Sequence, residues 1–574
     1  MCGILAKFNR SKQIDEADFE AQLDSIRHRG PDDKGIRTFE DGKIALGHTR
    51  LSFLDLSNSG KQPLSKAGLH IIFNGEIYNH NDLREEFKKK GAHFKSGTDT
   101  EVILEGYRLF GLGVFDKLNG MFAVVIYDAS NKEIILARDK YGIKPLYISN
   151  NNDSLTLASE LKVFQSDGGI SKKARFYFLL LGFVPEPTTI YPEVEMFPSG
   201  MATKVCSEKL ITIDSKEITY EHTIKESETL KESFVNAIEL QLSADVPIGV
   251  FLSGGLDSSA LVSLAKKDVQ TVSIYFDDED YSEKKFQKLI SDKYSLKHYE
   301  LLLTKSYFRE NIDDFLKSMD SPTIDGFNTY IVSKLAHESG LKSCLSGVGS
   351  DELLYGYPSF KRDKLLNVLC KVPGPIIDIL SKFERTKRLT FLKLKNKALG
   401  KYLVNRSLFL PEEIKELLQL DDKTIQSYIE DLERVYEVPQ DYSSLQKVSE
   451  LETSLYMKNQ LLRDADVFSM ANKLEIRVPF LDYNFSRIVS GTSDSQKESK
   501  AYNKPILVEF VKELIDDSIY NRNKSGFEIP YREWLSDELE HEYIPESIRN
   551  GFKGGTIHWS KVWALVVLNK FDNR

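Results

Sequence analysis

Residues 246–265 decide the architecture of the longer part of the chain, and they read Val-Pro-Ile-Gly-Val-Phe-Leu-Ser-Gly-Gly-Leu-Asp-Ser-Ser-Ala-Leu-Val-Ser-Leu-Ala. The first seven residues are almost all apolar, which predicts a buried strand, and the stretch after residue 259 continues as a helix. The Ser-Gly-Gly-Leu-Asp-Ser-Ser turn between them sets consecutive backbone N–H groups at a helix N-terminus, where they can face a phosphate. The turn lacks the Gly-Lys-Ser/Thr ending of a Walker A loop. The sequence therefore predicts an α/β domain with a phosphate-binding loop of another kind.

The flanking sequence continues the alternation of helix and strand. A helical pattern runs from Leu230 to Leu242, a second strand is expected at 271–276, and a third at 342–345. Because helical stretches separate these strands, we expect a parallel sheet with crossover helices. From about 360 to 470 the chain is mostly amphipathic helix rich in Leu and Lys. We find no chemistry in 365–440 and expect solvated helices over a core.

The N-terminal third follows a different pattern. Short β-rich runs recur between turn signals at 43–47, 69–73, 121–127 and 134–137, and two helical patterns interrupt them near 80–90 and 100–110. Residues 207–226 are polar and indicate a connecting edge or a linker. We therefore expect a first domain over 1–206, a linker over 207–226 and a second domain over 227–574.

Composition excludes several classes of protein. The 574 residues are 41% hydrophobic and 28% charged, which is ordinary globular usage. The formal charge of −9 offers no overall positive field, so we expect no nucleic-acid partner and no membrane partner. The longest apolar run, Phe176 to Val184, is far shorter than the ~20 residues of a spanning helix, and no secretory signal is apparent, so we expect a cytoplasmic protein.

Cys2 has a special position among the four cysteines, which are too few and too scattered for a disulfide framework or a metal site. If Met1 is removed, the Cys2 thiol lies beside a free α-amine. An α-amine with a reference pKa of about 7.7–8.0 can accept the thiol proton at neutral pH. A small residue after Met is common, so Cys2 alone is weak support for a nucleophile.

Six motifs in a fixed order strengthen this interpretation; they are Cys2-Gly3-Ile4, His28-Arg29-Gly30-Pro31-Asp32, Gly47-His48-Thr49-Arg50-Leu51, Asn74-Gly75-Glu76-Ile77-Tyr78-Asn79, Gly97-Thr98-Asp99-Thr100-Glu101 and Ala137-Arg138-Asp139-Lys140-Tyr141-Gly142-Ile143-Lys144-Pro145-Leu146-Tyr147. Together they resemble the class II, N-terminal-nucleophile glutaminase domain. The resemblance implies an αββα sandwich with Cys2 as the nucleophile.

Amide hydrolysis needs an oxyanion hole, which the Asn74 amide and the Gly75 N–H can supply. By the same resemblance, the residues that hold the charged ends and the side chain of glutamine are Arg50, Leu51, Asn74, Gly75, Glu76 and Asp99. Taken singly, Asn74-Gly75 is also typical of a turn, Asp99 of a helix N-cap, and Arg50 of a surface charge. We interpret His28 and His48 as structural, without a metal.

The loop at 253–259 resembles the pyrophosphate loop of ATP-pyrophosphatases, which cleave ATP between the α- and β-phosphates and form adenylates. The resemblance assigns ATP binding to Leu252, Ser253, Gly254, Gly255, Leu256, Asp257, Ser258, Ser259, Ile274, Ser346 and Gly347. Asp257 and Asp351 are hard oxygen ligands that suit Mg²⁺. A second signature spans 462–471 and 474–482, and Lys524 begins a C-terminal motif whose charge can stabilise the α-phosphate and the leaving pyrophosphate.

From Cys2 to about Pro530, with thinner matches between 365 and 445, the chain resembles the glutamine-hydrolysing asparagine synthetases. This implies an α+β glutaminase sandwich followed by a doubly wound α/β synthetase domain. It also implies glutamine, ATP, Mg²⁺ and an acceptor such as aspartate as substrates, with no prosthetic group. The implied reaction joins glutamine hydrolysis to amidation of an acyl-adenylate, with ammonia crossing between the domains. A homodimer is an expectation of the family only.

The acceptor is open because the chain departs from the family at one position. Where these enzymes usually read Ser-Gly-Glu-Gly-Ser/Ala-Asp-Glu, Val348 replaces the acid, and an isopropyl group cannot accept a proton. Asparagine synthesis is the first hypothesis. Amidation of a uronic-acid sugar in bacterial surface-polysaccharide pathways is the alternative. A catalytically silent regulatory homologue is disfavoured, because the glutaminase and loop motifs are intact.

Overall fold

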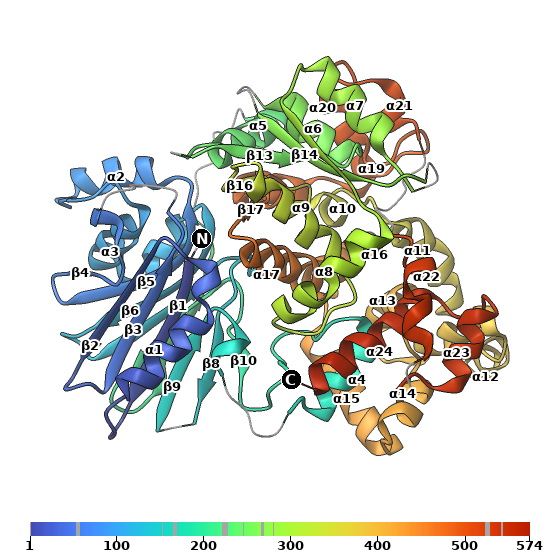
Figure 1. The fold of residues 1–574 in the computed structure, drawn as a ribbon, viewed down its shortest axis with the longest axis horizontal. Helices are drawn as coiled ribbons and strands as arrows, with labels where there is room; N and C mark the ends of the chain where they lie inside the picture. The colour runs from blue at the N-terminus through green and yellow to red at the C-terminus, as the bar shows by residue number, and fades with distance from the viewer. Residues whose placement is uncertain are drawn as a thin grey trace.

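The computed structural model describes the chain except residues 1, 53–57, 152, 165–168, 221–227, 245, 266–268, 279–280, 523–528, 541–542 and 574. A two-sheet sandwich forms the N-terminal part, and a parallel sheet surrounded by helices forms the C-terminal part (Figure 1). Among the described helices, none is long and apolar enough to cross a membrane.

The sandwich consists of two six-stranded antiparallel sheets. The first has the spatial order β10 (Glu195–Met196), β8 (Tyr147–Asn150), β9 (Ser154–Ala158), β1 (Cys2–Asn9), β3 (Ile44–Arg50) and β2 (Asp33–Phe39). The second has the order β12 (Ile211–Glu217), β11 (Met201–Cys206), β7 (Glu133–Arg138), β6 (Gly120–Asp128), β5 (Leu69–Ile77) and β4 (Leu64–Lys66). One apolar core lies between the sheets, with Ile4 from one and Val125 from the other.

Helices cover the outer faces of the sandwich. Helix α1 (Glu16–Ser25) buries Phe19 and Leu23 against the first sheet. Helices α2 (His80–Lys89) and α3 (Asp99–Phe110) cover the second. Because β6 is covered on both faces, it is buried almost throughout and reads as a continuous apolar run rather than an alternating one. The layers are α, β, β and α, as the sequence predicted.

The segment 207–226 is only partly a linker. Strand β12 occupies Ile211–Glu217 and pairs with β11, so the second sheet continues beyond residue 206. The strand was missed because it lies at the sheet edge, where both of its isoleucines are exposed and the other side chains are polar. Residues 221–227 of the expected linker lie outside the described residues.

The C-terminal sheet has five parallel strands in the order β15 (His298–Leu302), β14 (Gln270–Tyr275), β13 (Ile248–Phe251), β16 (Ser343–Leu345) and β17 (Glu475–Arg477). The chain moves outward from β13 in both directions, so the strand order reverses between β13 and β16. In open α/β sheets, ligands bind outside the carboxyl ends of the strands at such a point. The sequence predicted the three central strands but neither edge strand.

Helices surround this sheet and link it to the rest of the molecule; they are α5 (Leu230–Gln241), α6 (Leu256–Leu264), α7 (Lys284–Lys293), α8 (Lys305–Ser318), α9 (Phe327–Glu338), α10 (Ser350–Leu353), α16 (Ser444–Leu451), the π-helix η6 (Glu452–Leu462), α17 (Arg463–Ala471), α18 (Tyr483–Gly491), α19 (Asp494–Lys497), α20 (Pro505–Val511) and α21 (Asp517–Tyr520).

A further helical region forms the end of the molecule opposite the sandwich; it comprises α11 (Pro358–Leu369), α12 (Gly374–Leu380), the 3-10 segment η5 (Glu384–Lys393), α13 (Lys397–Arg406), α14 (Pro411–Leu418), α15 (Asp422–Val435), α22 (Tyr531–Trp534), α23 (Glu546–Lys553) and α24 (Trp559–Asp572) (Figure 1). Helix α4 (Lys172–Leu181) packs into its apolar core, and Leu408 N–H donates to Leu180 O over 2.7 Å. A segment that the sequence assigned to the first domain therefore belongs to the core of the second.

Candidate active sites

The thiol of Cys2 lies at the first residue of β1, opposite Arg50 of β3. The Cys2 backbone N–H donates to Asn74 Oδ1 over 3.0 Å. Cys2 is buried, and loss of hydration raises the pKa of its thiol, while the nearby N-terminal charge, the backbone N–H of Leu51 and Arg50 oppose that rise. The Cys2 nitrogen that donates to Asn74 is a peptide nitrogen in this chain. Removal of Met1 would turn it into an α-amine beside the thiol.

Asn74 and Gly75 lie side by side in β5, and Asn74 contacts the Cys2 strand. The buried Asn74 Nδ2 has no hydrogen-bond partner among the described residues, although its Oδ1 is bonded, and a buried donor of this kind suggests a ligand. Gly75 has φ of +154°, and a Cβ there would lie 2.0 Å from the Met121 carbonyl oxygen. Both residues lie within β5, so the alternative of a turn is wrong.

Glu76 and Asp99 form a buried acidic pair on the same side of the sandwich. Burial first, and then the charge of Asp99, raise the pKa of Glu76 well above its ordinary value, and burial also raises the pKa of Asp99. Asp99 Oδ2 accepts from Ile77 N–H over 3.0 Å. Two buried carboxylates whose negative charge is not fully balanced by nearby cations suit the ammonium group of an amino acid.

Two further alternatives fail at these positions. Thr98 caps α3, since its side chain accepts from Glu101 N–H, so Asp99 is not the N-cap. Arg50 is 7% exposed and therefore is not a surface charge. Leu51 is buried and packs against Met470 of α17 in the synthetase domain.

The two histidines have local partners. His48 is buried beside the Phe73 carbonyl oxygen, 3.3 Å from its Nε2, and burial lowers the pKa of its ring to about 3. His28 Nε2 lies 2.9 Å from Glu160 Oε1. No group of three or more His, Cys, Asp or Glu side chains that could hold a metal occurs among the residues for which coordinates are described.

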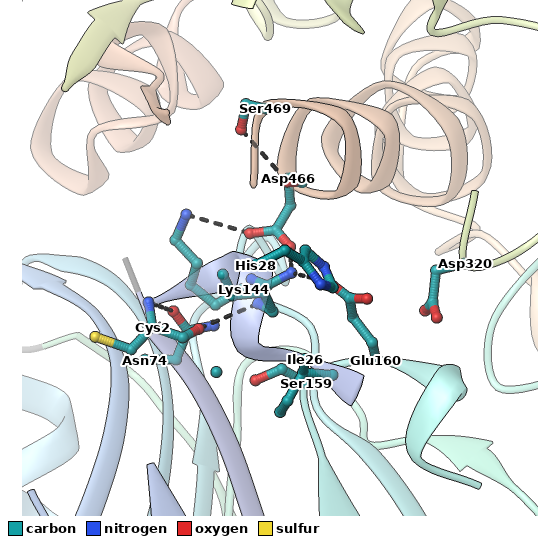
Figure 2. A network of polar contacts seen from close by, with 12 residues as sticks. Cys2, Ile26, His28, Asn74, Lys144, Ser159, Glu160, Asp320, Asp466 and Ser469 are labelled. Carbon is teal, nitrogen blue, oxygen red and sulfur yellow. Dashed lines mark hydrogen bonds and ion pairs between the residues drawn. The ribbon is translucent and has the colours of Figure 1, made fainter. Parts of the chain in front are cut away.

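A buried guanidinium links β1 to α17 of the C-terminal part. Figure 2 shows Cys2, Glu160 and Asp466, the three residues that this guanidinium contacts. Arg29 is fully buried; its Nε donates to the Cys2 carbonyl oxygen over 3.1 Å and its Nη1 to Glu160 Oε1 over 2.9 Å. The same Nη1 lies 2.8 Å from Oδ2 of Asp466 on α17. Lys144 Nζ lies 3.6 Å from the other oxygen of Asp466. Sequence reasoning quoted these motifs but assigned no role to Arg29 or Asp466.

A second buried guanidinium reaches the glutamine site from β17. Arg477 Nε donates to Glu475 Oε1 over 2.6 Å, and Nη2 lies 3.5 Å from Oε2 of Glu76. Arg477 Nη1 also donates to the Gln241 carbonyl oxygen over 2.8 Å. A residue assigned to glutamine binding is therefore in ionic contact with the synthetase sheet.

The loop after β13 has the form expected of a phosphate-binding turn, a glycine-rich segment at a helix N-terminus. Gly254 has φ of +81°, and the N-cap of α6 is Gly255, which has no side chain to occupy the first helical N–H groups. Ser253 N–H donates to Ser258 Oγ over 3.2 Å, which closes the loop. The second predicted phosphate element adjoins it, because a Cβ on Gly347 would lie 3.0 Å from Cβ of Asp257.

A cavity of about 230 Å³ opens beside this loop at the carboxyl ends of the strands. Four of its lining residues were predicted to bind ATP, namely Leu252, Ser253, Ile274 and Ser346. Val348 lines the same cavity, as do Asp325 and Asp464, which the sequence did not single out. Burial raises the pKa of both carboxyl groups, and Thr323 Oγ1 donates to Asp464 Oδ2 over 2.8 Å.

The predicted magnesium ligands converge on one lysine. Lys504 Nζ lies 2.6 Å from Asp257 Oδ1 and 2.6 Å from Asp351 Oδ1. Burial opposes protonation of Lys504, but the two carboxylates outweigh it and raise the pKa of its ammonium. Two carboxylates close enough to share one cation fit Mg²⁺, which takes few carboxylates and completes its shell with phosphate and water.

The sequence predicted one lysine of the nucleotide site, Lys524, and did not predict another, Lys504. Nothing in the local sequence distinguishes Lys504 from other lysines, because its partners lie more than 150 residues away along the chain. Lys524, predicted to be catalytic, lies outside the described residues, as do residues 525–528 of its motif.

Comparison with known proteins identifies both domains. Residues 1–216 match the glutamine amidotransferase domain, and residues 229–553 match asparagine synthase. The chain belongs to the asparagine synthase family, with an N-terminal glutamine amidotransferase domain. It is 31% identical to glutamine-hydrolyzing asparagine synthetase 1 of Bacillus subtilis (strain 168), over all of this chain and 94% of that protein.

Relatives with other names also match over most of their length. The amidase chry2 of Gibberella zeae is 26% identical over 94% of this chain and 88% of that protein. Among solved structures, a glutamine phosphoribosylpyrophosphate amidotransferase from B. subtilis has a TM-score of 0.30 and 16% identity over 60% of this chain and 82% of that chain. The two domain matches and the Bacillus relative place the chain among the glutamine amidotransferases of the asparagine synthase family, and this family implies use of ATP.

Proposed function

We propose that this protein transfers the amide nitrogen of glutamine to a carboxylate that it activates as an acyl-adenylate. The observation that carries the proposal is the buried Nδ2 of Asn74 next to the Cys2 strand, which finds no partner among the residues that the structure describes. An unsatisfied buried donor is costly unless a ligand uses it, and a developing oxyanion beside a thiol is such a ligand.

In the glutaminase half, the Cys2 thiolate attacks the side-chain carbonyl carbon of glutamine. After Met1 is removed, the α-amine takes the thiol proton and passes it to the leaving nitrogen. Ammonia leaves, a glutamyl thioester remains, and water then releases glutamate and restores the thiol. Asn74 Nδ2 and the Gly75 N–H stabilise the oxyanion, while Arg50 and the acidic pair Glu76 and Asp99 bind the charged end of the substrate.

In the synthetase half, an oxygen of the acceptor carboxylate attacks the α-phosphorus of ATP and pyrophosphate leaves. The N–H groups at the start of α6 and the ammonium of Lys504 can stabilise the phosphate charge. Asp257 and Asp351 would hold Mg²⁺, which neutralises phosphate charge when bound. Ammonia then attacks the acyl carbon and AMP leaves.

One proton of the attacking ammonia has to be accepted, and Val348 cannot accept it. Asp464 and Asp325 line the same cavity and are carboxyl groups of raised pKa, so we assign the proton acceptor to Asp464, with Asp325 as its neighbour. Burial is the main cause of the raised pKa of Asp464, and the charge of Asp325 adds to it.

Aspartate is the first candidate acceptor, supported by the name of the Bacillus relative. A sugar acid is the second candidate, and the lack of a cation in the described lining of the cavity supports it. The described residues around the cavity include two carboxylates but no Lys, Arg or His to pair with the α-carboxylate of aspartate. Hydroxyl groups of a sugar can donate to such carboxylates.

Acceptor-dependent exchange of labelled pyrophosphate into ATP tests this proposal without requiring glutamine. Purified protein with ATP and Mg²⁺ is incubated with aspartate or with uronic acids and their nucleotide conjugates. Exchange with one acceptor identifies the activated carboxylate. Absence of exchange with every carboxylate tried, in protein that still hydrolyses glutamine, would contradict the synthetase half.

A further inference from the structure

The region of α11, α12 and η5 carries an unusual group of exposed apolar side chains. Eleven large apolar side chains are exposed in the described part of the chain, and five of them fall within nineteen residues; they are Leu365, Val368, Ile376, Ile379 and Phe383. Their exposed fractions run from 47% to 66%. We call residues 361–397 the basic apolar face.

Packing of the helices does not explain these side chains. Helix α11 buries Phe360 and Leu366, and α12 buries only Ile377. Each helix therefore already packs against the core through other side chains. Ile376 and Ile379 of α12 instead point away from the core. Exposed apolar groups of this size cost free energy in water and commonly mark an interaction site when they cluster.

The same segment has a local charge opposite to that of the chain. Residues 361–397 contain eleven Lys or Arg residues and three Asp or Glu residues, a net charge of +8 in a chain whose total is −9. Nine of these basic side chains are exposed, namely Lys361, Arg362, Lys364, Lys371, Lys382, Arg388, Lys393, Lys395 and Lys397. Two of them have acidic partners, since Lys364 pairs with Glu498 and Lys393 with Asp378.

The basic apolar face is free to meet a large flat partner. Figure 1 shows α12 at the edge of the molecule opposite the sandwich, with α11 above it on the same side. Figure 1 places α12 far from the N-terminus and from β13, so a partner bound at α12 would not cover Cys2 or β13.

We propose that the basic apolar face docks the protein on an anionic lipid bilayer. Apolar side chains that enter the headgroup boundary, flanked by Lys and Arg that meet lipid phosphates, are the combination that holds proteins at a membrane surface without crossing it. The expectation of no membrane partner rested on the total charge, which conceals a local charge of opposite sign.

Two other occupants fit less well. A second copy in a two-fold arrangement would bring a charge of +8 against another +8, and like charges at an isologous contact repel. A nucleic acid would use the basic side chains but would leave the aliphatic ones in water, because four of the five apolar side chains cannot stack on bases. This inference does not depend on the proposed reaction.

Flotation of the full-length protein with lipid vesicles tests the docking. Vesicles of phosphatidylcholine alone are compared with vesicles that also contain phosphatidylglycerol, at low and at high salt. We expect binding only to the anionic vesicles and loss of most of that binding at high salt. No binding to anionic vesicles at low salt would overturn the proposal.

Two matched variants locate the contact. The triple change Leu365→Ser, Val368→Ser and Ile379→Ser is expected to weaken binding at least about tenfold, since each removes buried aliphatic carbons from the bilayer boundary. The control Ile211→Ser with Ile213→Ser removes side chains that are 50% and 49% exposed on β12 and is expected to leave binding within about twofold. Equal binding by both variants would place the contact elsewhere.

Two readouts distinguish lipid docking from misfolding and from self-association. Glutaminase activity and the thermal midpoint of unfolding are expected to be the same in the wild type and both variants, which shows that each is folded. Molar mass in solution is measured by light scattering for all three. A wild-type dimer that the triple variant dissociates would assign the basic apolar face to contact between copies and would overturn the lipid proposal.

Discussion

The change Asp466→Asn tests how the two catalytic sites are held together. Asp466 lies on α17 of the synthetase domain and is 3% exposed. Its two oxygens lie 2.8 Å from Arg29 Nη1 and 3.6 Å from Lys144 Nζ, and both cations belong to the glutaminase domain. An amide keeps the shape of the side chain but removes its charge, so the variant leaves two buried cations with less compensation.

The magnitude follows from the environment of Arg29. Breaking a buried ion pair costs about 3–5 kcal/mol, and the lower end applies here because Glu160 stays 2.9 Å from Arg29. About 3 kcal/mol is slightly more than a hundredfold in an equilibrium constant. Since the ion pair joins the two domains, we expect the change to favour domain separation by about that factor and to let ammonia escape into solvent.

The assay is the ratio of glutamate formed to amide product formed. We expect the ratio to rise severalfold in Asp466→Asn, while synthesis from added ammonium changes little. Asp422→Asn is the control, because Asp422 is 87% exposed in its pair with Lys415, and exposed pairs contribute about 0–1 kcal/mol. If Asp466→Asn keeps the wild-type ratio and the wild-type thermal midpoint, the reasoning about this link is refuted.

Four further predictions concern single residues. Cys2→Ser is expected to abolish glutamine-dependent synthesis and preserve synthesis from ammonium. Loss of both in a folded protein would contradict the assignment of glutamine hydrolysis and amide synthesis to separate sites. Asn74→Ala is expected to lower glutaminase kcat about 10²–10³-fold with KM little changed, and a smaller effect would remove Asn74 from the oxyanion hole. Asp464→Asn is expected to lower synthesis from ammonium about 10²–10⁴-fold with glutaminase intact, and full activity would exclude it as the proton acceptor. Burial lowers the pKa of Lys497 from 10.5 to about 8, although Asp494 opposes the shift. Between pH 8 and pH 10.5 the unfolded chain holds this proton and the folded chain does not. The cost to folding stability is therefore complete below pH 8 and vanishes as the pH rises through 10.5. Lys497→Met is thus expected to raise stability by about 3 kcal/mol at pH 7 and by little at pH 10.5, and an equal gain in urea midpoint at both values would contradict the assignment.

Much of the fold could be predicted from the sequence, because its main strands and loops have strong local sequence patterns. Strands β5, β6 and β13 are buried apolar runs between turn signals, and the glycine-rich loop has its predicted place between β13 and α6. The edge strands escaped notice for a physical reason. Strand β17 has three residues, two of them charged, and these two, Glu475 and Arg477, are buried and pair with each other beside β16.

The chemistry of the sites divides in the same way. Cys2, Asn74 and Gly75 stand in recognisable motifs, and the structure brings them together on β1 and β5. Lys504 and Arg29 could not be assigned from sequence, because their roles depend on partners from distant parts of the chain. Their charges are compensated only in the folded protein.

The central claim is transfer of the glutamine amide nitrogen to a carboxylate at the expense of ATP. The most direct measurement mixes the full-length protein with amide-¹⁵N glutamine, ATP, Mg²⁺ and the acceptor that supports pyrophosphate exchange, in a large excess of unlabelled ammonium. Mass spectrometry then reports the label in the product amide, beside AMP and pyrophosphate. The account predicts ¹⁵N-labelled amide in amounts equal to AMP; labelled ammonium with no labelled amide would contradict it.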